Sequence, residues 1–438
     1  MARYRVFCTA KCCSYWGRIP KFKPREDDLM SMIIPESGQS FAGRKRRIAF
    51  ASLLLIFVLF FLVSIPCACA QEYVARDLTI ELEDGIKTDA QLTLPKSVTG
   101  PFPGFLLLQG SGTIDMNEYL PPEVTGSDEP SRPFLQIAEH LSSRGIAVLR
   151  FNKRGVGLNG TILNASIVAN STYQSYKSDA EKALAILRAQ PEVDKNDITL
   201  LGHSEGAIVA PRIAREDAEI RKMVLLSAPA GNLRDNLQFQ LLARPLLYAE
   251  EVIDSNHDGF LTITEVEATM GTPGESLAPL QAIGLVMWNN TTEEHQWHSV
   301  ITSDRRGNIS IRGDLEPLVK KQVQPMLSNE SVKASPWLAS YFALNNTTDI
   351  IGDVSASILI LQGENDTQIP VREARMLEEK LMEVNHPDHT LIVYPGLGHS
   401  FHPLKNWIQP LGPMEEAVLE DLYAWLTSPD RRMREGAG

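Results

Sequence analysis

Short apolar runs recur along the chain between residues 73 and 227, separated by polar turns. From Tyr73 to Leu94, polar and apolar positions alternate around Asp84-Gly85, and this pattern predicts a β-hairpin. Four further apolar runs have the length of strands: 103–108, 146–150, 197–201 and 222–227. Two stretches have helical periodicity: 133–144 and 173–189. Strands that alternate with helices predict an α/β fold with a mostly parallel central sheet flanked by helices.

The strand pattern stops after Pro229 and resumes at about Asp353. The roughly 120 residues between them are rich in Leu, Gln and Glu, and a connection of this length without structure of its own is uncommon in a compact domain. We therefore predict an inserted, mainly helical cap at 230–352, between two parts of one core at 71–229 and 353–438. Apolar runs in the second part predict two more strands: 357–362 and 390–394.

A basic cluster at 44–47 precedes an uncharged apolar run, 48–65, and the small-residue motif Ala68-Cys69-Ala70. This arrangement is typical of a secretory signal peptide, which we assign to 44–70. An uncleaved membrane anchor is the alternative, because about 18 apolar residues approach the length that spans a bilayer. In either case we expect the catalytic body outside the cytoplasm, secreted or membrane-anchored through 48–65. The extension at 1–43 has no assigned fold.

The charge, cysteines and sequons of the chain indicate which partners and which compartment to expect for the part after the signal segment. The net charge is −12 at pH 7, and with a basic cluster near the N-terminus the remainder is more acidic still, which argues against nucleic acid as a partner. The cysteines precede the end of the signal segment, so a cleaved product would contain no thiol: Cys8, Cys12, Cys13, Cys67 and Cys69. Asn-x-Ser/Thr sequons are more numerous than chance predicts, which favours an exported surface. They begin at Asn159, Asn164, Asn170, Asn289, Asn290, Asn308, Asn329, Asn345, Asn346 and Asn365.

The segment 202–206 reads Gly-His-Ser-Glu-Gly, between an apolar run and a small-residue stretch that predicts the start of a helix. This is the pattern of a nucleophile elbow, a sharp turn that presents Ser204 to a base and to backbone N–H groups. Both glycines are expected where side chains would clash. His203 lies beside the nucleophile, where a side chain is expected to pack under the turn rather than act as the base.

A serine nucleophile needs a base and an acid that orients the base, and candidates follow later strands in the order Ser, Asp, His. Asp366 comes directly after the predicted strand 357–362. His399 lies in a loop after the last strand, with His402 as the nearby alternative. We predict Ser204, Asp366 and His399 as the catalytic residues.

Two backbone N–H groups are expected to form an oxyanion hole for the developing negative charge. One belongs to Glu205, the residue after the nucleophile. The other comes from the glycine-rich loop after strand 103–108, where Ser111 is favoured and Gly112 is the next choice.

These motifs together resemble the alpha/beta-hydrolase superfamily, and in particular exported esterases related to the serine aminopeptidase and dienelactone hydrolase groups. The resemblance spans about 73–427, except the middle of the cap. It is carried by the stretches 144–150, 153–157, 191–206, 335–337 and 363–366. It implies a Ser204-His399-Asp366 triad and hydrolysis of a carboxylic ester through an acyl-enzyme. Asn152 and Gln109 depart from the Asp and His that many relatives carry, and we expect both to alter local hydrogen bonding and substrate preference more than the reaction type.

The cap contains a second motif, in the loop 254–265. Oxygen ligands at positions 1, 3, 5, 9 and 12, a carbonyl at position 7 and glycine at position 6 match a calcium-binding EF-hand loop. We predict a structural calcium ion held by Asp254, Asn256, Asp258, Phe260, Thr262 and Glu265. A solvated acidic loop is the alternative. No glycine loop that binds dinucleotides or phosphates is present in the required form, so no organic cofactor is expected.

Three functions remain open at this point. The first is an exported serine esterase acting on a small-molecule ester. The second is an exopeptidase of the same fold, which an acidic pair that captures a free amino terminus would favour. The third is a calcium-dependent binding module on an inactive hydrolase scaffold, which the loss of a triad residue would favour.

Overall fold

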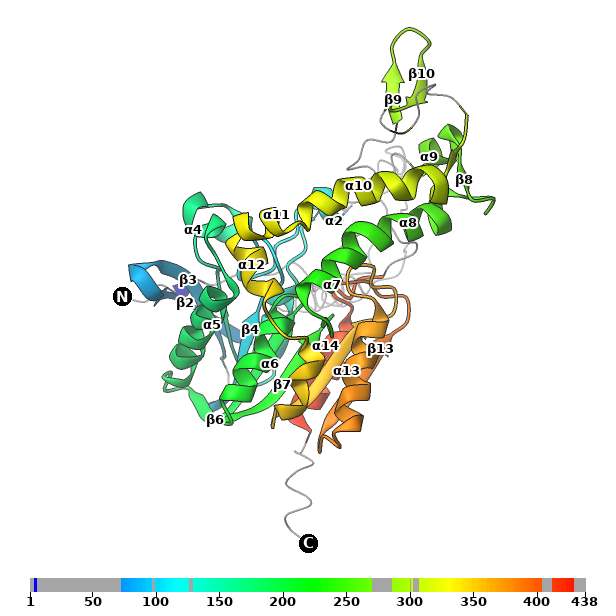
Figure 1. Ribbon diagram of the computed structural model, residues 1–438. Coiled ribbons are helices and arrows are strands. Elements are labelled where there is room, and N and C mark those ends of the chain that lie inside the picture. The colour runs from blue at the N-terminus through cyan, green and yellow to red at the C-terminus, as the bar shows by residue number, and fades with distance from the viewer. Residues whose placement is uncertain are drawn as a thin grey trace, which may run out of the picture. The chain divides into compact units, whose positions relative to one another are not determined.

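The computed structural model describes residues 4–5, 72–96, 99–125, 129–269, 286–299, 301, 307–403 and 412–428 (Figure 1). The predicted signal or anchor at 44–70 and all five cysteines lie outside these residues. No helix in the described part of the chain is long and apolar enough to cross a membrane.

A nine-stranded sheet forms the centre of the fold, in the order β1-β2-β3-β5-β4-β6-β7-β12-β13. The strands are β1 (Tyr4–Arg5), β2 (Tyr73–Glu81), β3 (Lys87–Pro95), β4 (Phe102–Leu108), β5 (Ala147–Phe151), β6 (Val193–His203), β7 (Ile220–Leu226), β12 (Ser357–Gly363) and β13 (His389–Tyr394). The pairings among β5, β4, β6, β7, β12 and β13 are all parallel, whereas β1, β2 and β3 join them antiparallel. The predicted mostly parallel sheet is confirmed, including the hairpin at 73–94.

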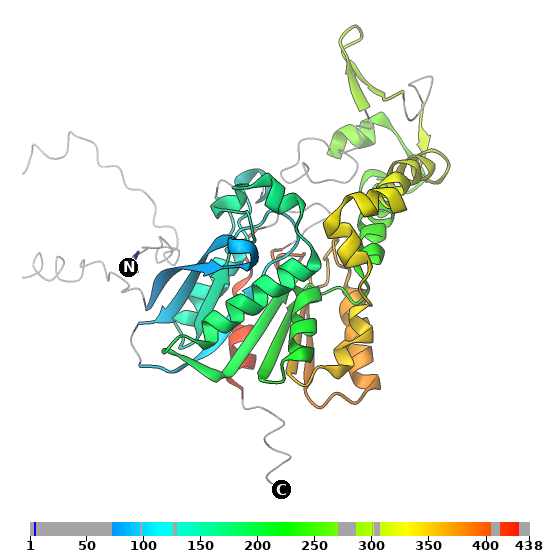
Figure 2. The same ribbon diagram turned by 60° about the vertical axis from the view of Figure 1, so that its left-hand side comes forward.

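Helices cover both faces of this sheet (Figure 2). The helices of the core are α2 (Pro122–Thr125), α3 (Pro133–Ser142), α4 (Ala165–Ala169), α5 (Tyr173–Arg188), α6 (Gly206–Glu216), α13 (Val371–Glu383) and α14 (Glu416–Thr427). Apolar residues of α5, α6 and α13 pack in one buried cluster against the sheet, and those of α3 and α14 pack in another. Parallel strands with helices on both sides are buried on both faces, which explains their continuous apolar runs.

Local sequence explains where these helices begin. Thr172 caps α5 by accepting a hydrogen bond from the Ser175 N–H, and the Ser175 side-chain oxygen accepts one from the Thr172 N–H, which forms a capping box. Pro133 occupies the first turn of α3, where a missing N–H costs nothing. Both helices match the stretches predicted from periodicity.

The insertion between β7 and β12 has a buried apolar cluster of its own, around Trp297 and Leu315. Its described helices are α7 (Leu233–Gln238), α8 (Arg244–Tyr248), α9 (Ile263–Thr269), α10 (Glu316–Met326), α11 (Asn329–Ala334) and α12 (Pro336–Phe342). Two antiparallel strand pairs accompany them: β9 (Val286–Asn289) with β10 (Glu294–Trp297), and β8 (Phe260–Leu261) with β11 (Ile309–Ser310). Helix thus dominates the described part of the insertion, and these strand pairs were not predicted.

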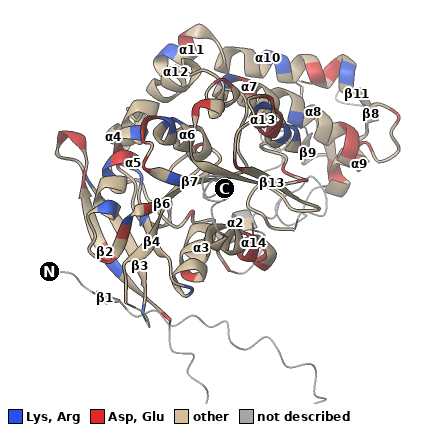
Figure 3. Ribbon diagram, turned by 90° about the horizontal axis from the view of Figure 1, so that it is seen from below, with Lys and Arg blue, Asp and Glu red and all other residues tan. Residues whose placement is uncertain are grey.

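Single turns of other helix types complete the described elements. Three are π-helical: Phe239–Ala243, Ala249–Ile253 and Ile311–Leu315. Four are 3₁₀-helical: Glu83–Gly85, Leu158–Gly160, Thr347–Asp349 and Ile351–Asp353. Charges are mixed along α10, while α9 carries acidic residues in its first turns (Figure 3).

Candidate active site

The turn between β6 and α6 holds Ser204 in a strained backbone conformation. Its φ is 52°, in the left-handed region that side chains other than glycine rarely adopt, and its N–H donates to the Leu226 carbonyl over 3.0 Å. A Cβ added to Gly202 would lie 2.3 Å from the Gly206 carbonyl oxygen, and one added to Gly206 would lie 2.0 Å from the Leu108 carbonyl oxygen. Close backbone approach therefore demands both glycines, as the elbow pattern predicts.

Asp366 and His399 meet beyond the ends of β12 and β13. The His399 Nδ1 lies 2.8 Å from the Asp366 Oδ2. The other oxygen of Asp366 accepts hydrogen bonds from the N–H groups of Gln368 and Ile369. Burial alone would raise the pKa of Asp366, but the charge and hydrogen bond of His399 and these N–H groups lower it. Asp366 is thus an ionised, fixed partner for the imidazole.

His402, the alternative base, points elsewhere. Its Nδ1 lies 2.9 Å from the carbonyl oxygen of Pro413. It is also more exposed than His399. The carboxylate that would orient a catalytic imidazole therefore contacts His399 and not His402.

His203 connects the nucleophile elbow to the His399 loop. The rings of His203 and His399 lie 4.8 Å apart, and the His203 Nε2 is 3.3 Å from the His399 carbonyl oxygen. Ser227 also donates to that carbonyl, over 3.0 Å. The described residues include no hydrogen bond between the Ser204 hydroxyl and the His399 ring. Ser204 and the Asp366-His399 pair nevertheless share one edge of the sheet, and such contacts often tighten only when substrate binds.

The loop after β4 brings Ser111 to the same edge. Ser111 and Glu205, the two predicted oxyanion donors, both line a cavity of about 390 Å³. Among the described residues, neither N–H donates a hydrogen bond, so both remain available to an oxyanion. Gly112, the second choice, has a φ of 94° and lines the same cavity.

Glu118 is a site residue that the sequence did not reveal. One of its oxygens, Oε1, accepts from the Gly110 N–H over 2.8 Å and lies 2.9 Å from the His203 Nδ1. Burial would lower the pKa of His203, but the charge and hydrogen bond of Glu118 raise it overall. The pair links the oxyanion loop to the elbow, across a sequence distance that no local pattern encodes.

A family comparison adds to this geometry. A model of the family described as "Serine aminopeptidase, S33" matches residues 124–403, a range that contains Ser204, Asp366 and His399. The chain belongs to this family.

Two curated relatives are similar to this S33-family chain. Esterase EstD of Thermotoga maritima is 31% identical over 171 residues, which cover 39% of this chain and 36% of the esterase. A monoglyceride lipase homolog of Monkeypox virus is 22% identical over 302 residues, covering 69% of this chain and 86% of the homolog. The match to EstD therefore spans little more than a third of that protein.

Solved structures are similar as well. A putative dienelactone hydrolase from Klebsiella pneumoniae is 13% identical, with a TM-score of 0.44 over 82% of this chain and 99% of that one. The mostly parallel sheet, the helices on both of its faces and the strand-turn-helix elbow at Ser204 give this S33-family protein an alpha/beta-hydrolase fold.

The cavity beside the oxyanion loop has apolar walls and two ion pairs. Val156, Val168, Tyr176 and Trp337 contribute its apolar side. The Lys153 Nζ lies 2.6 Å from the Glu205 Oε2, and the Trp337 Nε1 donates to the Glu205 Oε1 over 2.6 Å. Trp337 belongs to α12, so the insertion contacts the residue that directly follows the nucleophile.

A second ion pair, Arg154 with Asp179, lines the same cavity. Two guanidinium nitrogens of Arg154 bind the two oxygens of Asp179, at 2.8 and 2.6 Å. This bidentate bond raises the pKa of Arg154 even though burial opposes the shift. Both oxygens of the Asp179 carboxylate therefore already accept a hydrogen bond from Arg154.

The two departures from the superfamily pattern are both buried and anchor neighbouring loops. The Gln109 Nε2 donates to the Phe151 carbonyl, and the Tyr176 hydroxyl donates to the Gln109 carbonyl over 2.9 Å. The Asn152 Oδ1 accepts from the Met116 N–H over 2.8 Å. Gln109 thus joins the end of β4 to β5 and α5, and Asn152 joins the end of β5 to Met116. That the two residues alter the hydrogen bonding found in relatives stays a prediction.

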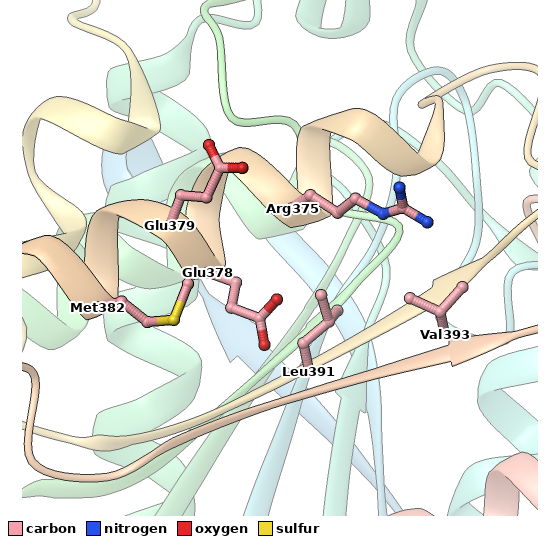
Figure 4. Close-up of a pocket in the computed structure, with 6 residues that line it drawn as sticks. All are labelled: Arg375, Glu378, Glu379, Met382, Leu391 and Val393. Atoms are coloured by element: carbon pink, nitrogen blue, oxygen red, sulfur yellow. The ribbon is translucent and has the colours of Figure 1, made fainter.

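Another hollow, of about 450 Å³, lies between α13 and β13 (Figure 4). Its lining residues are Arg375, Glu378, Glu379, Met382, Leu391 and Val393. None of them is a predicted catalytic or oxyanion-hole residue, whereas both predicted oxyanion donors, Ser111 and Glu205, line the other cavity.

The predicted calcium loop is closed by hydrogen bonds from its own backbone. Asp254 accepts from the N–H groups of Asp258 and Gly259, over 3.1 and 2.8 Å. The Glu265 Oε2 accepts from both the N–H and the hydroxyl of Thr262. Asn256 and Phe260 share this turn network through Asp258, whose N–H donates to the Asn256 Oδ1 and whose Oδ1 accepts from the Phe260 N–H. The predicted ligands therefore lie in one compact turn.

One further group of metal-ligating residues occurs in the described part of the chain. The His140 Nδ1 lies 3.5 Å from Glu416, and its Nε2 lies 3.8 Å from Glu420. Arg144 already donates to Glu420 over 2.8 Å. Because this cation holds one of the carboxylates, we assign no metal to the group.

Proposed function

We propose that this S33-family protein is a serine hydrolase that cleaves carboxylic esters through an acyl-Ser204 intermediate. The observation that carries the proposal is the buried Asp366-His399 pair, at the same sheet edge as the strained Ser204 elbow. A carboxylate that holds Nδ1 leaves Nε2 of the imidazole to act as the base.

The reaction follows from these positions. The His399 Nε2 takes the Ser204 proton as the hydroxyl oxygen attacks the ester carbonyl. The N–H groups of Ser111 and Glu205 stabilise the resulting oxyanion. The imidazolium then protonates the leaving alcohol, and a water molecule, deprotonated by the same imidazole, releases the acid from Ser204.

The charges of the cavity favour an ester over a peptide with a free amino terminus. An exopeptidase would need carboxylates that are free to bind the substrate ammonium group. Among the residues that line the cavity, the acidic ones are Asp179 and Glu205. Arg154 neutralises the first and Lys153 the second. A cationic substrate would have to displace one of these buried ion pairs, at a cost of several kcal/mol.

The walls of the cavity favour an uncharged substrate with an apolar chain. Val156, Val168 and Trp337 supply apolar surface next to the oxyanion loop. A volume of about 390 Å³ falls within the range of sites for small molecules. The esterase and the monoglyceride lipase homolog among its relatives agree with such a substrate.

Export of the protein belongs to the same proposal. The sequon asparagines are all exposed or half-exposed, as glycosylation would require. Together with the signal pattern at 44–70, this supports a secreted or membrane-anchored enzyme with its site outside the cytoplasm. Treatment of the secreted protein with an N-glycosidase should increase its mobility, whereas unchanged mobility would argue against glycosylation.

We also propose that the loop 254–265 binds one calcium ion that braces the insertion. Five side chains with oxygen donors, at loop positions 1, 3, 5, 9 and 12, together with a carbonyl at position 7, fit the coordination that calcium prefers. Gly259 at position 6 has a φ of 83°, which suits the bend of such a loop. Calcium outside cells is abundant enough to fill a loop of modest affinity.

The test is hydrolysis of p-nitrophenyl esters of increasing chain length by the full chain, compared with Ser204→Ala. We expect turnover by the native protein, at least a 10³-fold loss in the variant, and labelling of Ser204 by a fluorophosphonate. Hydrolysis of aminoacyl amides but not esters would favour the exopeptidase. No turnover and no labelling would favour a binding module on an inactive scaffold.

A further inference from the structure

Each of the two peptide groups that flank the Gly110 Cα forms a hydrogen bond with a charged side chain that is largely shielded from water. The Gly110 N–H donates to the Glu118 Oε1 over 2.8 Å. On the other side, the Lys153 Nζ donates to the Gly110 carbonyl oxygen over 2.5 Å. The side chains of Glu118 and Lys153 are 6% and 13% exposed, so both contacts are largely shielded from water.

The Lys153 contact also fixes the direction of the next N–H group. In a trans peptide the carbonyl and the following N–H belong to one rigid plane and point in opposite directions. The carbonyl of Gly110 shares its plane with the N–H of Ser111. An ammonium group bound to this oxygen therefore turns the Ser111 N–H away from Lys153 and holds it there.

This peptide lies against the nucleophile. A Cβ added to Gly110 would be 3.4 Å from the Ser204 Cβ. The same ammonium group lies 2.6 Å from the side chain of Glu205, whose own N–H is the second predicted donor. One cation thus contacts the Glu205 side chain and the Gly110 carbonyl, whose peptide group carries the Ser111 N–H.

We propose that Lys153 is a positioning residue for the oxyanion hole: it orients the Ser111 N–H through the Gly110 carbonyl. The inference rests on the proposed serine hydrolase function. Lys153 itself does not touch the substrate carbonyl. Its effect is confined to the transition state, because the negative charge that Ser111 would stabilise develops only there.

Lys153→Met removes the cation but keeps most of the side chain. On its own it would also leave the buried carboxylate of Glu205 unpaired, which destabilises the fold. The double variant Lys153→Met/Glu205→Gln removes that charge and retains an oxygen for the Trp337 N–H. Glu205→Gln alone is the reference for it. Lys177→Met is the matched control, because Lys177 forms ion pairs with Glu181 and Glu216 and does not line the cavity.

The measurements are kcat and KM for the best p-nitrophenyl ester, the dissociation constant of a trifluoromethyl ketone with the same acyl chain, and the melting temperature. This ketone forms a tetrahedral adduct whose oxyanion occupies the hole. Relative to Glu205→Gln, we expect the kcat of the double variant to be about 100-fold lower, the effect of losing one oxyanion donor. Its KM should stay within a factor of about three of the KM of Glu205→Gln. Binding of the ketone should weaken by a similar factor, and the melting temperature should match that of Glu205→Gln.

Three results would overturn the inference. A double variant with the kcat of Glu205→Gln would show that Lys153 only neutralises a buried charge. An increase of KM with unchanged kcat would assign Lys153 to substrate binding instead. A native protein that neither hydrolyses esters nor reacts with a fluorophosphonate would remove the proposed function and this role together, whereas the first two results leave the proposed function intact.

Discussion

At the scale of single residues, the tightest constraint in the site is steric. Gly206 lies so close to β4 that a methyl group would overlap the Leu108 carbonyl oxygen at 2.0 Å. No side chain can rotate out of such a contact, since Cβ is fixed by the backbone. The elbow and the oxyanion loop must therefore separate if any side chain is introduced here.

Gly206→Ala should accordingly lower the free energy of unfolding by more than about 3 kcal/mol, since overpacking against backbone cannot be relieved by a rotamer change. Gly85→Ala is the control. Gly85 also has a positive φ, 69°, but no atom lies within 4 Å of an added Cβ, so its cost is limited to about 1–2 kcal/mol of backbone strain. Urea denaturation compares the two variants, and equal losses would refute the steric explanation.

A second prediction at this scale concerns Asp366, the acid of the proposed triad. Asp366→Asn keeps the size of the side chain but removes the charge that holds the imidazole in the productive tautomer. We expect kcat for ester hydrolysis to fall by about 10⁴-fold with little change in KM. The change of His402 to Gln serves as the control, because the hydrogen bond of the His402 ring goes to the Pro413 carbonyl and not to Asp366. A normal kcat in Asp366→Asn would exclude this aspartate from the triad.

At the scale of elements, the contact between α12 and the elbow joins the insertion to the core. The Trp337 Nε1 donates to the Glu205 carboxylate, which is 4% exposed. Hydrogen bonds to a buried charge contribute more than those between neutral groups. The position of α12 is therefore coupled to that of the nucleophile turn.

Trp337→Phe removes this donor and keeps an aromatic ring. We expect a loss of about 1.5–3 kcal/mol in the free energy of unfolding, the usual value for a hydrogen bond to a charged group, and an increase in KM as the cavity wall loosens. Trp425→Phe is the matched control, because Trp425 contacts Lys222 through its ring face. If the two variants lose stability equally and KM stays constant, the contact with Glu205 has no special role.

The elements also show what the sequence could and could not predict. The sheet, its crossover helices and the elbow were predictable because each depends on spacing within about 20 residues. The contacts of Glu118 with His203 and of Lys153 with Gly110 join residues 85 and 43 positions apart. No periodicity or motif encodes such pairs, so the two charged contacts around the oxyanion loop became visible only in the fold. The same reason explains the strand pair β8-β11, whose partners Leu261 and Ile309 are set by the packing of the insertion.

At the scale of the whole molecule, the buried pairs Asp366-His399 and Glu118-His203 make the free energy of unfolding depend on pH in opposite directions. Asp366 has a lowered pKa, so its contribution is present above its ordinary value of 3.8 and disappears as pH falls through the lowered value. His203 has a raised pKa, so its contribution is present below its ordinary value of 6.5 and disappears as pH rises through the raised value. The two pairs are strongest together between these limits.

We therefore expect the contribution of these two pairs to the free energy of unfolding to be greatest between about pH 4 and pH 6.5 and to decrease on the alkaline side. Urea denaturation from pH 4 to pH 9 measures this profile. His203→Asn should flatten the alkaline decrease and leave the acidic side unchanged. An identical alkaline decrease in that variant would mean that other groups cause it.

Calcium gives the last prediction at this scale. Because a metal that binds only the folded state adds to stability by mass action, millimolar calcium should raise the melting temperature of the full chain, and a chelator should reverse the effect. Glu265→Gln should abolish the calcium dependence by weakening the ligand at loop position 12. Equal melting temperatures with calcium and with chelator would leave 254–265 as a solvated acidic loop.

The left-handed backbone of Ser204 has a consequence for the evolution of this protein. Glycine would adopt a φ of 52° at no steric cost, so Ser204→Gly should fold more stably than the native chain while losing its nucleophile. Under the proposed function, selection for turnover would keep serine at this position although glycine would make the fold more stable. In a gene copy without that selection, Ser204→Gly would increase stability at no functional cost. We therefore expect non-catalytic descendants of this protein to carry glycine at position 204.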